Sequence, residues 1–184
     1  MTRFDPVGIT IQESNNQIVF IPDPAGLIQT NGTIFFSNDT ALQIDITLSG
    51  VALVSIAPKA QSNGLLVAMS GPQDLNCSNH GAVAYTLQVS DQFTLIQPPT
   101  GGPGATFLPL QLSPGNWMLW QNNDTQAHQP TPDAGTTWTT NPPLIAPYSW
   151  SQMVQFPTAG NFPYHCAKHP QEKGTISVSS SVVS

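Results

Sequence analysis

The sequence predicts an all-β fold made of two tandem β-sandwiches, and three observations support this prediction. The chain of 184 residues contains 18 prolines and 14 glycines, and its apolar residues show little of the 3.6-residue period of helices. Short segments with alternating apolar and polar residues recur instead. A Cys-x-x-His motif also occurs twice, at Cys77 and at Cys166. The interval between these two cysteines matches the length of one small sandwich and is too long for a solenoid repeat.

The repeat also predicts where the chain divides. When Cys77 is aligned with Cys166, His80 falls opposite His169 without a gap. Apolar residues on either side of the motif are aligned as well. We therefore predict two domains, residues 1–91 and residues 92–184.

The alternating segments define the expected strands of both domains. In the first domain they span residues 8–13, 17–22, 33–37, 43–48, 65–69 and 84–90. In the second domain they span residues 93–97, 106–110, 116–121, 151–156 and 174–182. The segment 97–104, rich in Pro and Gly, is expected to form a hairpin loop. The segment 129–149 has no strand pattern and is expected to wrap one edge of the second sandwich.

Composition excludes several classes of partner. Four basic residues against ten acidic ones give a net charge of -6, without the basic clusters that nucleic acid or anionic lipid requires. No apolar run approaches the length of a membrane span. The first residues also lack the apolar stretch of a signal peptide, so we expect a mature chain from which a leader has been removed.

The segment from Tyr164 to Gly174 is the strongest candidate for a functional site. Cys166 and His169 stand three residues apart on a tight loop, and a thiolate with an imidazole is a good pair of metal ligands. The loop lies between two apolar segments, which predicts a strand, a ligand loop and a second strand. A third ligand is expected from His128, which follows an Asn- and Asp-rich turn.

This loop resembles the ligand loop of amicyanin and plastocyanin, which belong to the cupredoxins. Their loop reads Cys-x-x-His-Pro-x-Met-x-Gly, and this chain matches it at Cys166, His169, Pro170 and Gly174. It departs at one position, because Glu172 stands where the family carries its axial methionine.

The resemblance implies two tandem cupredoxin-like Greek-key β-sandwiches, the second of which binds one copper ion per chain. It assigns His128, Cys166 and His169 as ligands, and we expect Glu172 to be an unusual fourth ligand. The implied function is one-electron transfer between redox proteins such as a cytochrome or an oxidoreductase, not catalysis. The resemblance also implies a periplasmic or secreted protein, and the net charge predicts a basic partner.

Four alternatives remain open at this stage. Zinc accepts the same set of Cys, two His and a carboxylate. The site could serve copper storage without any redox partner. His165, directly before Cys166, also resembles a ligand of the second copper in two-domain nitrite reductases, although Asp133 stands where that family has its other catalytic histidine. Finally, Glu172 could point into water and leave a three-coordinate ion.

The first domain is expected to be a degenerate copy. Matching the Asn-Asp-Thr segments at residues 38–40 and 123–125 places Gln43 opposite His128. Cys77 and His80 then lack the partners that would complete a site. The alternative is a second, weaker copper site in which Gln43 is a ligand.

Overall fold

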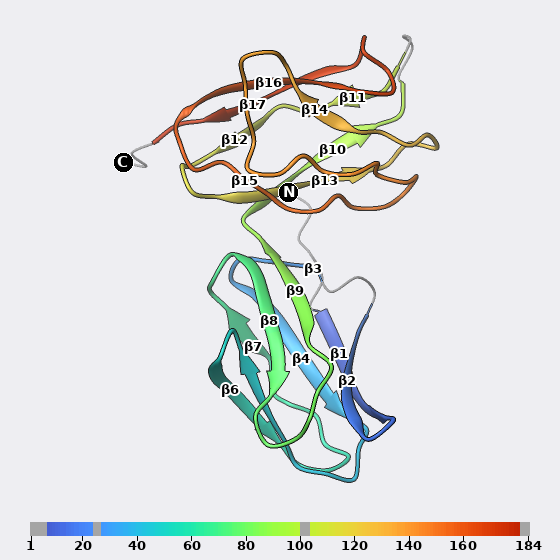
Figure 1. Cartoon of the computed structure of the whole chain (residues 1–184), viewed down its shortest axis with the longest axis vertical. Coiled ribbons are helices and arrows are strands. Elements are labelled where there is room, and N and C mark those ends of the chain that lie inside the picture. The colour runs from blue at the N-terminus through green and yellow to red at the C-terminus, as the bar shows by residue number, and fades with distance from the viewer. Residues whose placement is uncertain (1–6, 24–26, 100–103, 181–184) are drawn as a thin grey trace. The chain divides into compact units, whose positions relative to one another are not determined.

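The structure is a computed structural model, and it describes residues 7–23, 27–99 and 104–180. All regular elements in these ranges are β-strands, which form two compact units, Met1–Val89 and Ser90–Ser184 (Figure 1). The predicted fold class, all-β with two tandem β-sandwiches, is confirmed. Within the described ranges, no helix has the length and hydropathy needed to cross a membrane.

The first unit packs a four-stranded sheet, in the order β2-β1-β4-β7, against a five-stranded sheet, in the order β3-β9-β8-β5-β6. The strands of the first sheet are β1 (Val7–Ser14), β2 (Gln17–Asp23), β4 (Gly32–Asn38) and β7 (Leu65–Val67). Those of the second are β3 (Leu27–Gln29), β5 (Ile44–Leu48), β6 (Val51–Ile56), β8 (Gly71–Cys77) and β9 (Tyr85–Ser90).

The second unit consists of two four-stranded sheets, in the orders β11-β10-β13-β15 and β12-β17-β16-β14. The strands of the first are β10 (Gln92–Gln97), β11 (Thr106–Phe107), β13 (Trp117–Asn122) and β15 (Val154–Gln155). Those of the second are β12 (Leu110–Leu112), β14 (Pro130–Pro132), β16 (Gly160–Cys166) and β17 (Lys173–Val178).

Each unit contains a parallel strand pair of the same kind, which joins segments that are distant in sequence. β1 pairs in parallel with β4, and β10 pairs in parallel with β13. Since parallel neighbours cannot be joined by a tight hairpin, each pair needs a connection through the opposite sheet.

Alternation of buried and exposed residues explains the two cores. The residues of β8 alternate strictly between buried and exposed positions, as a strand with one face in the core requires. The second core is more aromatic, and its buried members include Phe107, Trp120, Phe156 and Tyr164.

Trp120 and Tyr164 form the floor beneath the ligand loop. The Nε1–H of Trp120 donates a hydrogen bond of 3.1 Å to the hydroxyl oxygen of Tyr164, and both side chains are fully buried. Burial raises the pKa of Tyr164, so its hydroxyl stays neutral. The ring of Tyr164 covers Gly174, where an added Cβ would lie 2.4 Å from a ring carbon. Glycine at this position therefore allows the loop to close tightly onto its aromatic support.

Most of the expected strands are present, with several differences. The sequence prediction missed β3, β6, β8 and β14, and the expected strand 106–110 is divided between β11 and β12. The segment 129–149 contributes β14, which pairs with β16 at the edge of its sheet. β10 pairs antiparallel with β11, as a hairpin at 97–104 requires, although residues 100–103 lie outside the described ranges. The last strand ends at Val178, and part of its expected extension, residues 181–182, is also outside them.

Candidate metal centre

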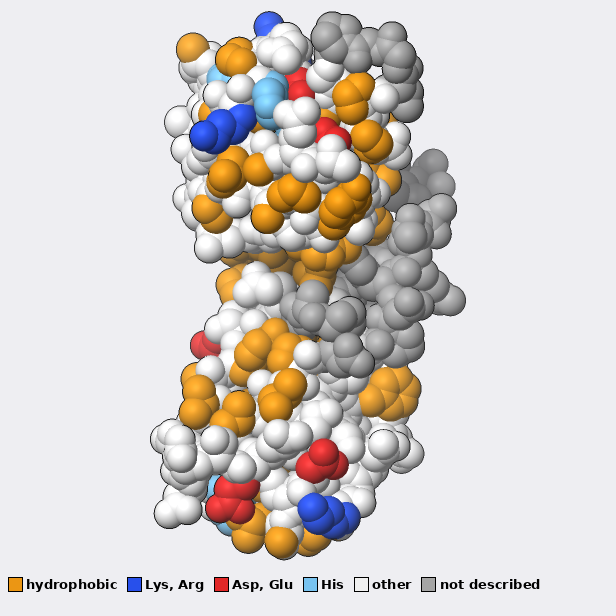
Figure 2. Space-filling model, turned by 90° about the vertical axis from the view of Figure 1, so that its right-hand side faces the viewer, with side chains coloured by type: hydrophobic (Ala, Val, Ile, Leu, Met, Phe, Trp, Pro, Cys, Tyr) orange, Lys and Arg blue, Asp and Glu red, His pale blue; other side chains and the backbone are white. Residues whose placement is uncertain are grey.

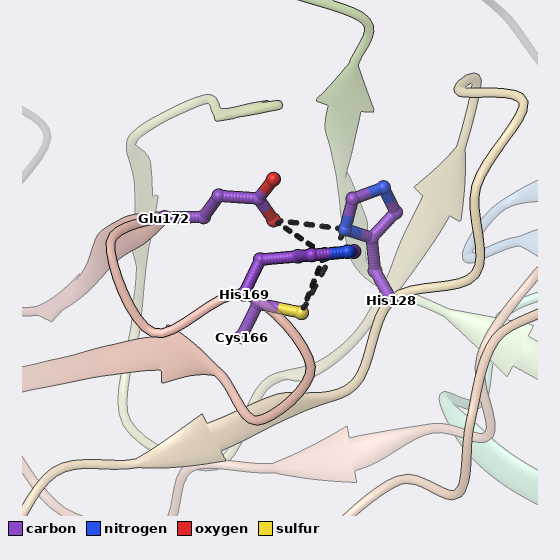
Figure 3. A group of neighbouring side chains, drawn as sticks. All are labelled: His128, Cys166, His169 and Glu172. Carbon is purple, nitrogen blue, oxygen red and sulfur yellow. Dashed lines mark hydrogen bonds and ion pairs between the residues drawn. The ribbon is translucent and has the colours of Figure 1, made fainter. Parts of the chain in front are cut away.

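Four side chains of the second unit converge at one end of the sandwich. Each of His128, Cys166, His169 and Glu172 contributes one potential ligand atom, and these atoms all lie within 4.8 Å of one another (Figure 3). Among the described residues, no other cluster of three or more His, Cys, Asp or Glu side chains has such a geometry.

The distances between the ligand atoms suit one small metal ion. The Sγ of Cys166 lies 3.7 Å from the Nδ1 of His128 and 3.7 Å from the Nδ1 of His169. The Oε2 of Glu172 lies 2.9 Å from the first of these nitrogens and 3.4 Å from the second. Metal bonds of about 2.0 Å to nitrogen and about 2.3 Å to sulfur place neighbouring ligands roughly 3.5 Å apart in a tetrahedron. The donor set therefore fits copper or zinc without large rearrangement.

Strand pairing and a buried carboxylate position His128. Pro130 in β14 pairs with Cys166 at the end of β16, so the histidine two residues earlier reaches the cysteine. The Nε2 of His128 lies 3.0 Å from the Oδ2 of Asp124, and both side chains are buried. A proton on Nε2 donated to this carboxylate would leave the lone pair of Nδ1 facing the other three side chains.

The environment of Asp124 keeps its carboxylate charged. Burial raises its pKa, but hydrogen bonds from His128 and from the backbone N–H of Thr125 outweigh this effect, and the pKa is lowered overall. The side chain is consequently ionised at neutral pH. Asp124 was not predicted as a site residue, although an acidic residue four positions before a candidate ligand was a usable signal.

Backbone hydrogen bonds fold the ligand loop tightly around Cys166. Its N–H donates to the carbonyl oxygen of Glu172 at 3.0 Å, while the N–H groups of His169 and Glu172 donate to Cys166 and His169 at 3.1 and 2.9 Å. The N–H of Gln129 also points at the Sγ of Cys166, at 3.4 Å. A hydrogen bond to the sulfur stabilises the thiolate form that metal binding requires.

Glu172 is aimed into the cluster by the chain segment before β11. Its Oε1 accepts a hydrogen bond of 2.7 Å from the N–H of Ala105, which leaves Oε2 facing the two imidazoles. Gly104 permits this approach, because an added Cβ would lie 2.9 Å from the Cγ of Glu172 and its φ of +94° disfavours other residues. Sequence analysis did not identify this contact, since Gly104 and Ala105 carry no functional group.

The cluster is closed on all sides but one. The side chain of His128 is fully buried and that of Glu172 is 3% exposed, whereas that of His169 is 26% exposed. The imidazole of His169 is thus the route by which the cluster meets the exterior.

His165 and the two methionines of the second unit lie outside the cluster. The Nδ1 of His165 lies 2.6 Å from the Oδ1 of Asp133, and both side chains are partly exposed. Met118 and Met153 are buried, the first of them within the aromatic core. The fourth potential ligand atom of the cluster is accordingly a carboxylate oxygen of Glu172.

The first unit repeats the scaffold of the site but not its first imidazole. The Nδ2 of Asn38 donates to three carbonyl oxygens, those of residues 42, 56 and 57. Asn122 makes the same three bonds, to residues 126, 145 and 146. Asn38 therefore corresponds to Asn122, and counting forward places Ile44, not Gln43, opposite His128. The sequence alignment was wrong by one residue. It matched the identical Asn-Asp-Thr segments and not the two asparagines whose side chains bind the loop carbonyls.

Cys77 and His80 of the first unit form hydrogen-bond contacts with nearby polar groups. Ile44 is fully buried, so the position of the first imidazole holds a hydrocarbon side chain. The Sγ of Cys77 donates to the Oδ1 of Asn79 at 2.9 Å, and the Nε2 of His80 lies 3.0 Å from the carbonyl oxygen of Gln43. Both cysteines of the protein are free thiols.

Replacing Asp124 with alanine is expected to weaken metal binding by about 10- to 100-fold, because His128 loses the partner that orients its ring. A competition titration with a chromophoric chelator measures this affinity. The matched control is Thr40→Ala, since Thr40 occupies the equivalent position of the first unit, two residues after Asn38. Equal losses of affinity in both variants would show that Asp124 does not act through His128.

Comparisons with known proteins give structural neighbours only. No protein-family model and no curated protein matches the sequence. Among solved structures, a purple cupredoxin from Nitrosopumilus maritimus is 23% identical, covers 48% of this chain and 100% of its own, and has a TM-score of 0.42. The oxidised state of one amicyanin mutant is 21% identical, with coverage of 50% and 86% and a TM-score of 0.40. The Cu(I) form of another amicyanin mutant is 20% identical, with coverage of 49% and 85% and a TM-score of 0.40.

Proposed function

We propose that this protein binds one copper ion in its second unit and carries single electrons between redox partners. The convergence of a thiolate, two imidazoles and a carboxylate within 4.8 Å carries the proposal. His128, Cys166 and His169 would be the principal ligands, and Glu172 the fourth. A copper ion bound there would alternate between Cu(I) and Cu(II), since a thiolate with two imidazoles suits both states.

The surrounding residues would keep this change of oxidation state simple. Asp124 and the tight ligand loop fix the positions of three ligand atoms, so little rearrangement is needed. Burial of Glu172 and His128 excludes water from the ion. His169, the partly exposed ligand, would provide the path for the electron to a partner protein such as a cytochrome or an oxidoreductase.

The first unit would act as a scaffold without copper. Its buried Ile44 and the internal hydrogen bonds of Cys77 and His80 support this assignment. The same proposal places the protein in the periplasm or outside the cell, in keeping with its low content of charged residues and its resemblance to exported electron carriers.

Copper titration of the metal-free protein tests this function. We expect one equivalent of Cu(II) per chain, strong visible absorption from the thiolate, and a reversible one-electron wave in voltammetry. Two equivalents would assign copper to the first unit as well. Zinc bound in preference to copper, or copper bound without a reversible wave, would contradict electron transfer and favour a structural or storage site.

A further inference from the structure

The charges of the protein are divided unevenly between its units. Residues 1–89 contain six carboxylates and two basic residues, so this unit supplies four of the six net negative charges. Residues 90–184 contain only six charged side chains of Asp, Glu, Lys and Arg. They are Asp91, Asp124, Asp133, Lys168, Glu172 and Lys173.

Three of the four carboxylates of the second unit are not exposed on the surface around the ligand loop. Asp124 and Glu172 are buried and directed at His128. Asp91 accepts a hydrogen bond from the N–H of Trp117, at the first residue of β13, whereas His128 follows the other end of that strand. A strand of this length spans about 20 Å, which exceeds the Debye length of about 8 Å at physiological salt.

Both basic side chains of this unit lie on the ligand loop itself. Lys168 directly precedes His169 and Lys173 directly follows Glu172, and both are exposed. Every ion pair between described residues involves a histidine, so neither lysine is neutralised by a carboxylate. The remaining carboxylate, Asp133, is partly exposed and hydrogen-bonded to His165. Figure 2 shows basic, acidic and histidine side chains close together on one face of this unit.

The exposed charges around His169 are therefore mostly cationic, two lysines against one partly exposed carboxylate, on a protein whose net charge is negative. We propose that this surface, formed by Lys168, His169 and Lys173, docks onto an acidic face of a redox protein. The inference rests on the proposed function, because it names the chemistry of the partner that exchanges electrons through His169. It also reverses the basic partner that net charge alone predicts.

An inert anion locates this surface without any copper. Hexacyanochromate(III) carries three negative charges and is paramagnetic, so it broadens the NMR signals of amides near its binding site. With the metal-free protein, we expect the strongest broadening at residues 167–173. The double substitution Lys168→Gln and Lys173→Gln is expected to reduce that broadening at least about threefold, because the local potential depends on these two charges.

Lys59→Gln is the matched control, since it removes one exposed lysine from the first unit. It is expected to leave the broadening at residues 167–173 unchanged. The proposal fails if the double variant broadens like the parent, or if the strongest broadening lies elsewhere. Unchanged chemical shifts outside the loop verify that each variant keeps the parent fold.

Electron exchange with two small reagents gives the second readout. Oxidation of the Cu(I) protein by hexacyanoferrate(III) is expected to slow about three- to tenfold as salt is raised, and oxidation by tris(phenanthroline)cobalt(III) to accelerate. The opposite salt dependence would favour a basic partner and overturn the proposal. A protein that reacts with neither reagent would contradict the proposed function, while the NMR measurement would still decide where anions bind.

Discussion

Substitution of Cys166 by serine is expected to abolish the strong visible absorption of the copper-loaded protein. A hydroxyl cannot replace the thiolate as a soft ligand, and the remaining imidazoles and carboxylate favour Cu(II) over Cu(I). The affinity for copper should fall by more than the roughly 10- to 100-fold loss that follows mutation of an outer-shell partner. Visible and EPR spectra with a copper titration measure both effects.

The first unit provides an internal control for this substitution. Cys77→Ser makes the same chemical change at the corresponding cysteine, whose Sγ binds Asn79 and which faces no imidazole ligand cluster in the described structure. It is expected to leave the spectrum and the copper stoichiometry unchanged. If Cys77→Ser lost the absorption and Cys166→Ser kept it, the copper site would lie in the first unit and not in the second.

The sequence predicted which side chains lie close together where their proximity depends on local spacing. Cys166 and His169 are three residues apart on a short loop, so they lie close together whatever the details of the sheets. His128 was found because it is a histidine after a turn. The fold class also followed from alternation, since one face of each long strand must be buried.

The parts that sequence did not predict depend on contacts across the fold. β8 alternates correctly, but its buried positions include polar Gln73, and nothing in its pattern separates it from a loop. β14 consists of only three residues, two of them proline, and exists because the edge of β16 accepts it. The alignment placed Gln43 opposite His128, where the structure places Ile44, for the same reason. Only the carbonyl partners of Asn38 and Asn122 establish which residues correspond.

The contact between Glu172 and the segment before β11 is the least predictable feature of the site, and it leads to the second large effect. Substitution Glu172→Met is expected to raise the reduction potential of the copper protein by roughly 100 mV, about a fiftyfold shift toward Cu(I). The reason is that a carboxylate is a hard, negatively charged ligand that stabilises Cu(II), whereas a thioether is soft and neutral. Voltammetry measures the potential, and the visible spectrum should change with it.

Two further variants separate ligation by Glu172 from its structural role. Glu172→Gln retains an oxygen that can accept the hydrogen bond from Ala105 but removes the charge, so a potential close to that of Glu172→Met would assign the effect to the carboxylate. Gly104→Ala keeps the glutamate but displaces its side chain, because the added Cβ would lie 2.9 Å from the Cγ of Glu172. It is therefore expected to shift the potential in the same direction. If all three variants keep the parent potential and spectrum, Glu172 is not a ligand, and the ion is held by His128, Cys166 and His169 alone.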